Sequence, residues 1–250
     1  MNKFSFTTSW DDGSVHDLKV AELLSRHGLK GTFYIPETFD GVGGKYASYD
    51  RRLTESEIHS LAQTQEIGGH TMSHRRLTSL PLEEASREIS DCRDFIQGIT
   101  GEAPKMFAFP GGAFNESLVE IVREAGFIAA RTTRKGVTRI AESAPQVMDV
   151  TIVCQPYPFR RVDKNHYYWG KLLEPLALYS PRRYALSWQS LARAWFKKAY
   201  ADGDYFHLYG HSWEIEKYDM WHELDSFFAF VREHNDIILG SNSEVVPSRK

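Results

Sequence analysis

Two neighbouring carboxylates, Asp11 and Asp12, follow the β-prone run SFTTSW and stand directly before Gly13. Within a regular strand, neighbouring side chains point to opposite faces. At the end of a strand, a glycine lets the backbone turn, so both carboxylates can face one pocket. The pair therefore has two interpretations: an ordinary surface loop, or a catalytic centre in which each carboxylate has its own task.

A second group is the pair His70 and His74 in the segment GGHTMSH, which follows another β-prone run. Histidines four residues apart lie on one side of a helical turn, where both imidazoles can bind one ion. Two imidazoles and one carboxylate leave coordination positions open for water and substrate, as in catalytic divalent metal sites. The spacing alone also fits a surface or core pair, and the position after a strand is what favours a metal site.

Two further strand ends carry polar or glycine residues. In FAFPGGAFN, the turn Pro110, Gly111 and Gly112 could bring free backbone N–H groups to an oxyanion, or could simply join a strand to a helix. In FHLYGH, His207 and His211 share parity along a strand, and His211 lies nearer its end. A lone histidine is more often structural, and the choice between the two as a general acid stays open.

Strands and helices that would position these residues alternate along the chain. The expected strands cover residues 4–10, 30–36, 66–70, 106–112, 127–133, 147–154 and 205–211, and the expected helices cover 15–28, 54–63, 81–99, 115–126, 187–203 and 219–234. This alternation predicts an α/β fold with a parallel sheet, either a barrel or a doubly wound sheet, in a single domain over 1–250. The irregular stretch 155–181 is interpreted as an insertion near the site.

Bulk properties exclude several classes of protein. The 250 residues carry a formal net charge of -3, which gives no general attraction to nucleic acid or anionic membranes. Two cysteines, Cys92 and Cys154, are too few for a disulfide framework and are expected to be buried thiols. No apolar run approaches the length of a membrane span, and the first residues lack the apolar segment of a secretory signal. We expect a cytoplasmic protein whose oligomeric state is open.

The motifs TSWDDG, HTMSH, FPGG and YGH, in this order, resemble those of the polysaccharide deacetylase family, the carbohydrate esterases that share the NodB homology domain. The resemblance implies an incomplete (β/α) barrel and a divalent metal ion, commonly zinc. It also implies that Asp11 is the general base and His211 the general acid. By the same resemblance, Asp12, His70 and His74 are the metal ligands.

The chain departs from the family pattern at three places. Trp10 stands where the first motif usually has phenylalanine. Ala108 stands about where the third motif has an arginine that orients the catalytic aspartate, and Arg131 could supply that charge from another strand. The fourth motif has its nearest counterpart in residues 163–169.

The expected reaction is hydrolysis of an N-acyl group, acetyl in the first instance, from an amino sugar or glycan. Two alternatives stay open: hydrolysis of another small amide, such as a formamide on a lipid-linked sugar, and a non-catalytic carbohydrate-binding protein. Aromatic residues in or near expected loops could stack on sugar rings, although such residues more often fill cores. They are Tyr46, Tyr49, Tyr157, Tyr167, Tyr168, Trp169 and Trp213.

Overall fold

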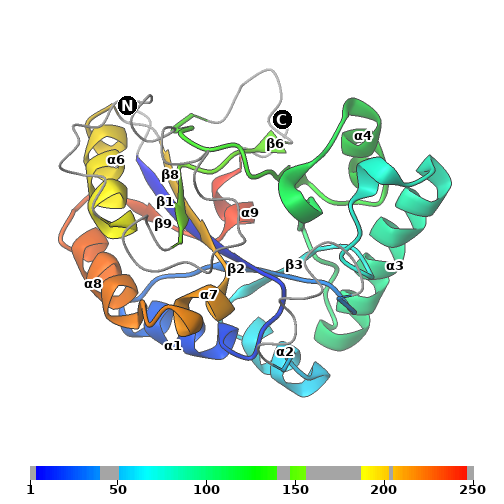
Figure 1. The fold of residues 1–250 in the computed structure, drawn as a ribbon, viewed down its shortest axis with the longest axis horizontal. Coiled ribbons are helices and arrows are strands. Elements are labelled where there is room, and N and C mark those ends of the chain that lie inside the picture. Colours follow the sequence, from blue (N-terminus) through cyan, green and yellow to red (C-terminus); the bar gives the residue numbers. More distant parts are fainter. Residues whose placement is uncertain (1–3, 40–50, 140–146, 156–186, 203–204, 247–250) are drawn as a thin grey trace, which may run out of the picture.

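The structure is a computed structural model that describes residues 4–39, 51–139, 147–155, 187–202 and 205–246. Of the expected insertion over 155–181, only Gln155 lies within these described residues. The fourth-motif segment 163–169 lies outside them, and so do all the aromatic residues named above as candidates for sugar stacking except Trp213. Within them the strands form one curled parallel sheet, with helices packed around its outside (Figure 1). This is the incomplete (β/α) barrel that the family resemblance implied, and it decides against the doubly wound sheet.

Strand β1 (Ser5–Asp11) lies in the interior of the sheet, between β2 (Thr32–Ile35) and β8 (Tyr205–Gly210). The path continues from β2 through β3 (Glu66–Gly69), β4 (Met106–Ala108) and β5 (Ala129–Arg131) to β6 (Val147–Met148). On the other side of β1, β8 pairs with β7 (Ile152–Cys154), while the short β9 (Ile238–Leu239) pairs with the start of β1. All these pairs are parallel, so the carboxyl ends of the strands meet at one end of the barrel.

The expected single strand over 147–154 is wrong, because the segment forms two strands at opposite edges of the sheet. β6 pairs with β5 and β7 pairs with β8, and only residues 149–151 separate them. Since the two edge strands are nearly consecutive in the chain, the sheet must curl round until its edges approach each other. The side chain of Asp149 accepts hydrogen bonds from Thr132 and Arg134, which holds the connection between the strands.

Alternation along β1 separates two environments. Phe4, Phe6 and Trp10 face outward and pack in the main apolar core with residues of the covering helices. Thr7 and Ser9 point the other way and contact His207 of β8 inside the barrel. The inner face of β1 is therefore polar, and it leads to Asp11 at the end of the strand.

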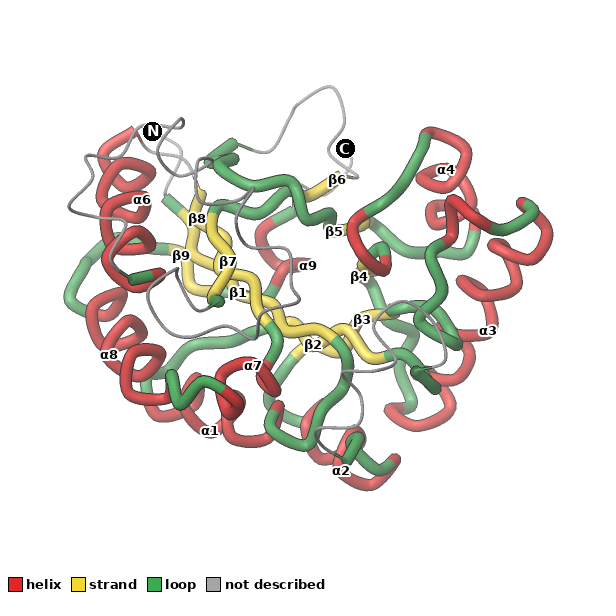
Figure 2. Tube along the Cα trace, viewed as in Figure 1, coloured by secondary structure: helices red, strands yellow, loops and turns green. Residues whose placement is uncertain are grey.

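The covering helices are α1 (Asp17–Arg26), α2 (Glu55–Ala62), α3 (Leu82–Thr100), α4 (Glu116–Glu124), α6 (Trp188–Asp202) and α8 (Trp221–Arg232) (Figure 2). Thr54 and Glu57 form a capping box at the start of α2, and the Asn115 side chain caps α4 by accepting from the Leu118 N–H. Pro81 is the N-cap of α3 rather than its first residue. The sequence did not predict the short helices α7 (Ser212–Lys217) and α9 (Asn242–Val245).

Cys92 and Cys154 are buried and free, as expected. Among the described residues, no helix combines the length and the apolar character that crossing a membrane requires.

Candidate metal and catalytic site

Asp12, His70 and His74 meet at the carboxyl ends of β1 and β3. One potential ligand atom from each residue lies within 4.8 Å of those of the other two, and all three residues are buried. The Asp12 Oδ1 atom is 3.3 Å from His74 Nε2 and 3.8 Å from His70 Nε2. The structure thus brings together the three residues that the sequence predicted to be metal ligands.

Backbone conformation, rather than a helical turn, brings the two histidines together. His70 and His74 lie in an irregular segment in which Thr71 and His74 have positive φ values of 65° and 55°. Asp12 also has a positive φ, 84°, which is uncommon for a residue with a side chain. Such conformations cost free energy and cluster at functional sites, where the surrounding structure holds them in place.

The protonation states of the two histidines suit a cation. The His70 Nδ1–H donates to the carbonyl oxygen of Ala108 at 2.8 Å, which leaves the lone pair of Nε2 directed to the aspartates. Burial lowers the pKa of His70 although Asp11 and Asp12 oppose this shift. Burial lowers the pKa of His74 to about 4, although Asp12 opposes this shift. Both imidazoles are therefore neutral at pH 7, the form in which histidine binds metals.

One buried oxygen of Asp12 is in the position of a ligand atom for a cation. Asp12 Oδ1 has no hydrogen-bond partner among the residues that the structure describes, although it is buried. An unpaired buried carboxylate oxygen is costly, and a cation held with the two neutral imidazoles would remove that cost. The donor set of two nitrogens and one oxygen fits a divalent ion such as zinc.

Asp11 has a different environment from its neighbour. Both of its carboxylate oxygens accept hydrogen bonds from Nη2 of Arg131, and the exposed fractions of the two side chains are 3% and 0%. His70 Nε2 lies 3.6 Å from Asp11 Oδ2. Burial alone would raise the pKa of Asp11, but the charge of Arg131 outweighs it and lowers the pKa below its usual value. Asp11 is therefore an ionised carboxylate directly beside the candidate metal ligands.

Arg131 reaches Asp11 from the strand next to the one where the third motif would place an arginine. Ala108 of β4 and Arg131 of β5 are direct register partners. The small Ala108 side chain is buried, and the Arg131 guanidinium lies over the rings of Tyr209 and Tyr34, with centroid distances of 4.3 and 5.1 Å. The charge missing at position 108 is thus supplied at the same level of the barrel, from the adjacent strand.

His211 follows β8 and is the N-cap of α7. Its Nε2 lies 3.8 Å from Asp12 Oδ2 and 3.1 Å from the Tyr209 hydroxyl, and its Nδ1–H donates to Glu214 Oε2 at 2.9 Å. Burial acts to lower the pKa of His211, but Asp12 and Glu214 outweigh it and raise the pKa to about 9. A protonated imidazole therefore lies beside Asp12 at the candidate site.

His207, the other candidate acid, lies deeper inside the barrel. Its Nδ1 is 2.5 Å from Thr7 Oγ1 and its Nε2 is 2.8 Å from Ser9 Oγ, so hydroxyl groups contact both ring nitrogens. Burial lowers its pKa to about 3, which keeps the ring neutral. Of the two histidines, only His211 lies beside the aspartates as a protonated group.

The Pro110 to Gly112 segment forms a short 3-10 turn between β4 and α4. The Gly112 N–H donates to the Phe109 carbonyl oxygen at 2.8 Å, so it is not the free group that the oxyanion interpretation requires. Gly111 and Gly112 have positive φ values of 65° and 70°, and a side chain at Gly112 would clash with Thr133. These facts favour the interpretation as a strand-to-helix turn.

Two contacts at the start of α7 were not predicted from the sequence. The Trp213 indole N–H donates to Asp12 Oδ2 at 3.0 Å, whereas the sequence suggested only that this residue could stack on a sugar. Glu214 contacts His211, and the spacing of three residues at a helix start is the signal that could have found it.

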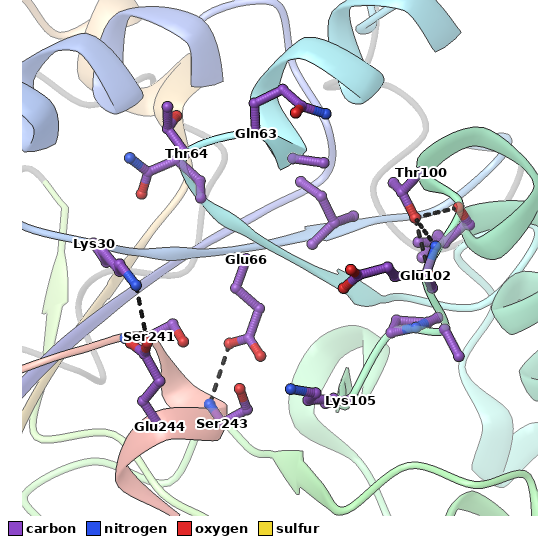
Figure 3. Close-up of a pocket in the computed structure, with 16 residues that line it drawn as sticks. Lys30, Gln63, Thr64, Glu66, Thr100, Glu102, Lys105, Ser241, Ser243 and Glu244 are labelled. Carbon is purple, nitrogen blue, oxygen red and sulfur yellow. Dashed lines mark hydrogen bonds and ion pairs between the residues drawn. The ribbon is translucent and has the colours of Figure 1, made fainter.

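A separate pocket of about 410 Å³ lies at the amino ends of the strands, opposite the candidate site (Figure 3). Lys30 precedes β2, Glu66 begins β3 and Lys105 precedes β4. Several polar groups in its wall are paired with one another: Lys30 Nζ with Glu244 Oε1 at 2.9 Å, and the Ser243 N–H with Glu66 Oε2 at 3.2 Å. It shares no residue with the Asp/His site.

A family model and two curated proteins each match about half of the chain. A family model described as polysaccharide deacetylase matches residues 1–130, which is just over half of the 250 residues. The chain belongs to the polysaccharide deacetylase family. It is 28% identical over 119 residues to the peptidoglycan-N-acetylmuramic acid deacetylase PdaC of Bacillus subtilis. It is 26% identical over 129 residues to a peptidoglycan-N-acetylglucosamine deacetylase of Bacillus cereus.

These curated relatives are longer than the matched region. The alignment with PdaC covers 47% of this chain and 23% of PdaC. The alignment with the Bacillus cereus deacetylase covers 51% of this chain and 43% of that protein. The chain thus spans less than half of either protein.

Solved structures support the fold over nearly the whole chain. A protein from Mycobacterium smegmatis, assigned to the polysaccharide deacetylases, matches with a TM-score of 0.70 at 16% identity, covering 98% of this chain and 90% of that one. A protein described as a CE4 family pseudoenzyme from Bacillus anthracis matches with a TM-score of 0.59 at 14% identity, covering 98% and 66%. At these identities the likeness shows the fold alone, so activity is argued from the site.

Proposed function

We propose that the protein is a metal-dependent hydrolase that removes an N-acyl group, acetyl in the first instance, from an amino sugar or glycan. One observation carries the proposal: two groups that could transfer protons lie within 4 Å of the Asp12, His70 and His74 cluster. One is the carboxylate of Asp11, which Arg131 holds, and the other is the protonated imidazole of His211. The two distances are 3.6 Å from Asp11 to His70 and 3.8 Å from His211 to Asp12. Membership of the polysaccharide deacetylase family supports the choice of substrate class.

Asp12, His70 and His74 would hold the divalent ion, and zinc is proposed because two neutral imidazoles and one carboxylate suit it. When bound, such an ion polarises the acyl carbonyl and lowers the pKa of a water molecule. The remaining steps fall to side chains of the chain itself.

Asp11 is proposed to take the proton from the attacking water. A general base must be ionised before the reaction, and Arg131 lowers the pKa of Asp11 against the effect of its burial. The guanidinium contacts both carboxylate oxygens, so it also fixes the direction of the carboxylate. Arg131 is thus proposed as the positioning residue for the base.

His211 is proposed to protonate the leaving amine. Water adds its oxygen to the acyl carbon, the C–N bond breaks, and the amine nitrogen takes the proton from His211 Nε2. Glu214 holds the opposite ring nitrogen at 2.9 Å, which fixes the orientation of the ring. The raised pKa, about 9, keeps the acid protonated at neutral pH.

Acid release from a panel of N-acetylated sugars, N-formylated sugars and cyclic amides, with and without a chelator, tests the function. We expect acetate release from the N-acetyl sugars, loss of that activity with chelator, and recovery after adding zinc. Preferential formate release would support the alternative amidase. Binding of N-acetylglucosamine oligomers without any metal-dependent turnover would refute the proposal and leave a carbohydrate-binding protein.

A further inference from the structure

Trp213 contacts the oxygen of Asp12 that does not face His70 and His74. The indole Nε1–H donates to Asp12 Oδ2 at 3.0 Å, while Asp12 Oδ1 lies 3.3 Å from His74 Nε2. Oδ1 has no hydrogen-bond partner among the described residues, although it is buried. The two oxygens of one carboxylate thus have different environments, one bonded to an indole and the other bare toward the imidazoles.

The fold holds the indole in this place. β8 runs parallel to β1 with Gly210 as the register partner of Trp10, so the start of α7 lies beside the end of β1. The Ser212 hydroxyl donates to the buried Asp17 Oδ1 at 2.6 Å, which attaches the first turn of α7 to the start of α1. Trp213 is therefore presented to Asp12 by a turn that is itself anchored.

Among the described residues, the other contacts that orient Asp12 come from its own backbone and from His211, whose Nε2 lies 3.8 Å from Oδ2. The Asp12 backbone N–H donates to the Tyr34 carbonyl oxygen at 3.1 Å, and its φ of 84° turns it out of the strand. The hydrogen bond from Trp213 then fixes the rotation of the carboxylate, because an indole N–H donates in only one direction. Binding an ion through both oxygens would require Oδ2 to leave the indole.

We propose that Trp213 is a positioning residue for the metal site: it holds Asp12 as a ligand that binds through the single atom Oδ1. This rests on the proposed function, in which Asp12, His70 and His74 hold the ion. Partners that orient metal ligands typically contribute about 10–100-fold to metal affinity. Losing the indole N–H is therefore expected to weaken metal binding by a factor in that range.

The substitution Trp213→Phe tests this role, because it keeps an aromatic ring and removes the donor. Trp221 offers a matched control, since its Nε1–H also donates to a carboxylate, that of Glu216, at 2.7 Å on the exposed surface. Zinc dissociation constants of the full chain are measured by chelator competition for wild type, Trp213→Phe and Trp221→Phe. Urea unfolding of the metal-free proteins reports whether the substitution acts only through the fold.

We expect Trp213→Phe to raise the zinc Kd by about 10–100-fold with little change in the unfolding midpoint, and Trp221→Phe to leave the Kd unchanged. An unchanged Kd in Trp213→Phe, or an equal rise in both variants, would overturn the role of Trp213 while the metal site stands. If wild type binds no zinc, the proposed function fails, and the role of Trp213 fails with it. If Trp213→Phe does not fold, Trp213→Leu, which also lacks a donor, is the second variant and the same criteria apply.

Discussion

The buried ion pair between Asp11 and Arg131 offers the sharpest test of how the site is built. Their side chains are 3% and 0% exposed, and both carboxylate oxygens bond to one guanidinium nitrogen. Removing one partner leaves a buried charge without compensation, which typically costs about 3–5 kcal/mol. Arg131→Met and Asp11→Asn should each lower the free energy of unfolding by an amount of this order.

The double variant separates the pair interaction from the effects of each substitution. Because it buries no uncompensated charge, it should be more stable than the sum of the single losses predicts, with a coupling of about 2–3 kcal/mol. Arg87 and Glu83 on α3 form the control, since their ion pair at 2.7 Å joins side chains that are 66% and 84% exposed. The coupling there should be about 0.3–0.5 kcal/mol.

Urea unfolding of the metal-free chain at pH 7 measures all the variants of both cycles. A coupling between Asp11 and Arg131 no larger than that between Glu83 and Arg87 would refute the reasoning. The pH dependence gives a second check. Without Arg131, burial raises the pKa of Asp11, so the stability deficit of Arg131→Met should shrink as the pH falls and Asp11 takes up a proton. If Arg131→Met does not fold, Arg131→Lys is measured instead and should recover part of the coupling.

Three other outcomes are expected. Asp11→Asn and His211→Ala should each lower kcat by about 10²–10⁴-fold while retaining bound metal, measured by acetate release and metal analysis; unchanged turnover would remove the assigned role. Burial lowers the pKa of His207 from 6.5 to about 3, so between these values the unfolded chain binds a proton that the folded chain does not, and stability should fall by up to about 1.4 kcal/mol for each unit by which the pH is lowered. That slope should flatten in His207→Gln, and equal slopes in urea unfolding would contradict the assignment. Gly112→Ala, at a φ of 70° and against a threonine hydroxyl, should lose at least about 1 kcal/mol. Gly98→Ala, in the last turn of α3 where an added side chain meets open space, should gain up to about 0.5–1 kcal/mol; similar effects at both positions would argue against the turn geometry.

The carboxyl ends of the strands could be predicted from the sequence because strand and helix alternate regularly up to residue 133. A parallel sheet places all those ends together, and this brought Asp11, Asp12, His70 and His74 to one site. The reason given for the histidine pair was wrong, since positive φ values at Thr71 and His74 replace the expected helical turn. Residue spacing indicates that two side chains can meet, but not which backbone path brings them together.

The division of 147–154 into two strands could not be predicted locally. Both halves are apolar and β-prone, and the break exists because the curled sheet brings its two edges near each other. The contacts of Trp213 and Glu214 were missed for a related reason. They depend on where α7 begins, and a helix of six residues has too little hydrophobic periodicity to be recognised from sequence.

The two adjacent aspartates differ in chemistry because of strand parity and one backbone angle. Asp11 is the last residue of β1 and shares the inward face with Thr7 and Ser9, so its carboxylate reaches Arg131 inside the barrel. The pairing with the guanidinium keeps Asp11 ionised, and each of its oxygens keeps a second lone pair that can accept a proton. Asp12 would point outward in a continued strand, but its φ of 84° turns it to the histidines with Oδ1 bare. One carboxylate is thus suited to accept a proton and the other to hold a cation, although the residue type is the same.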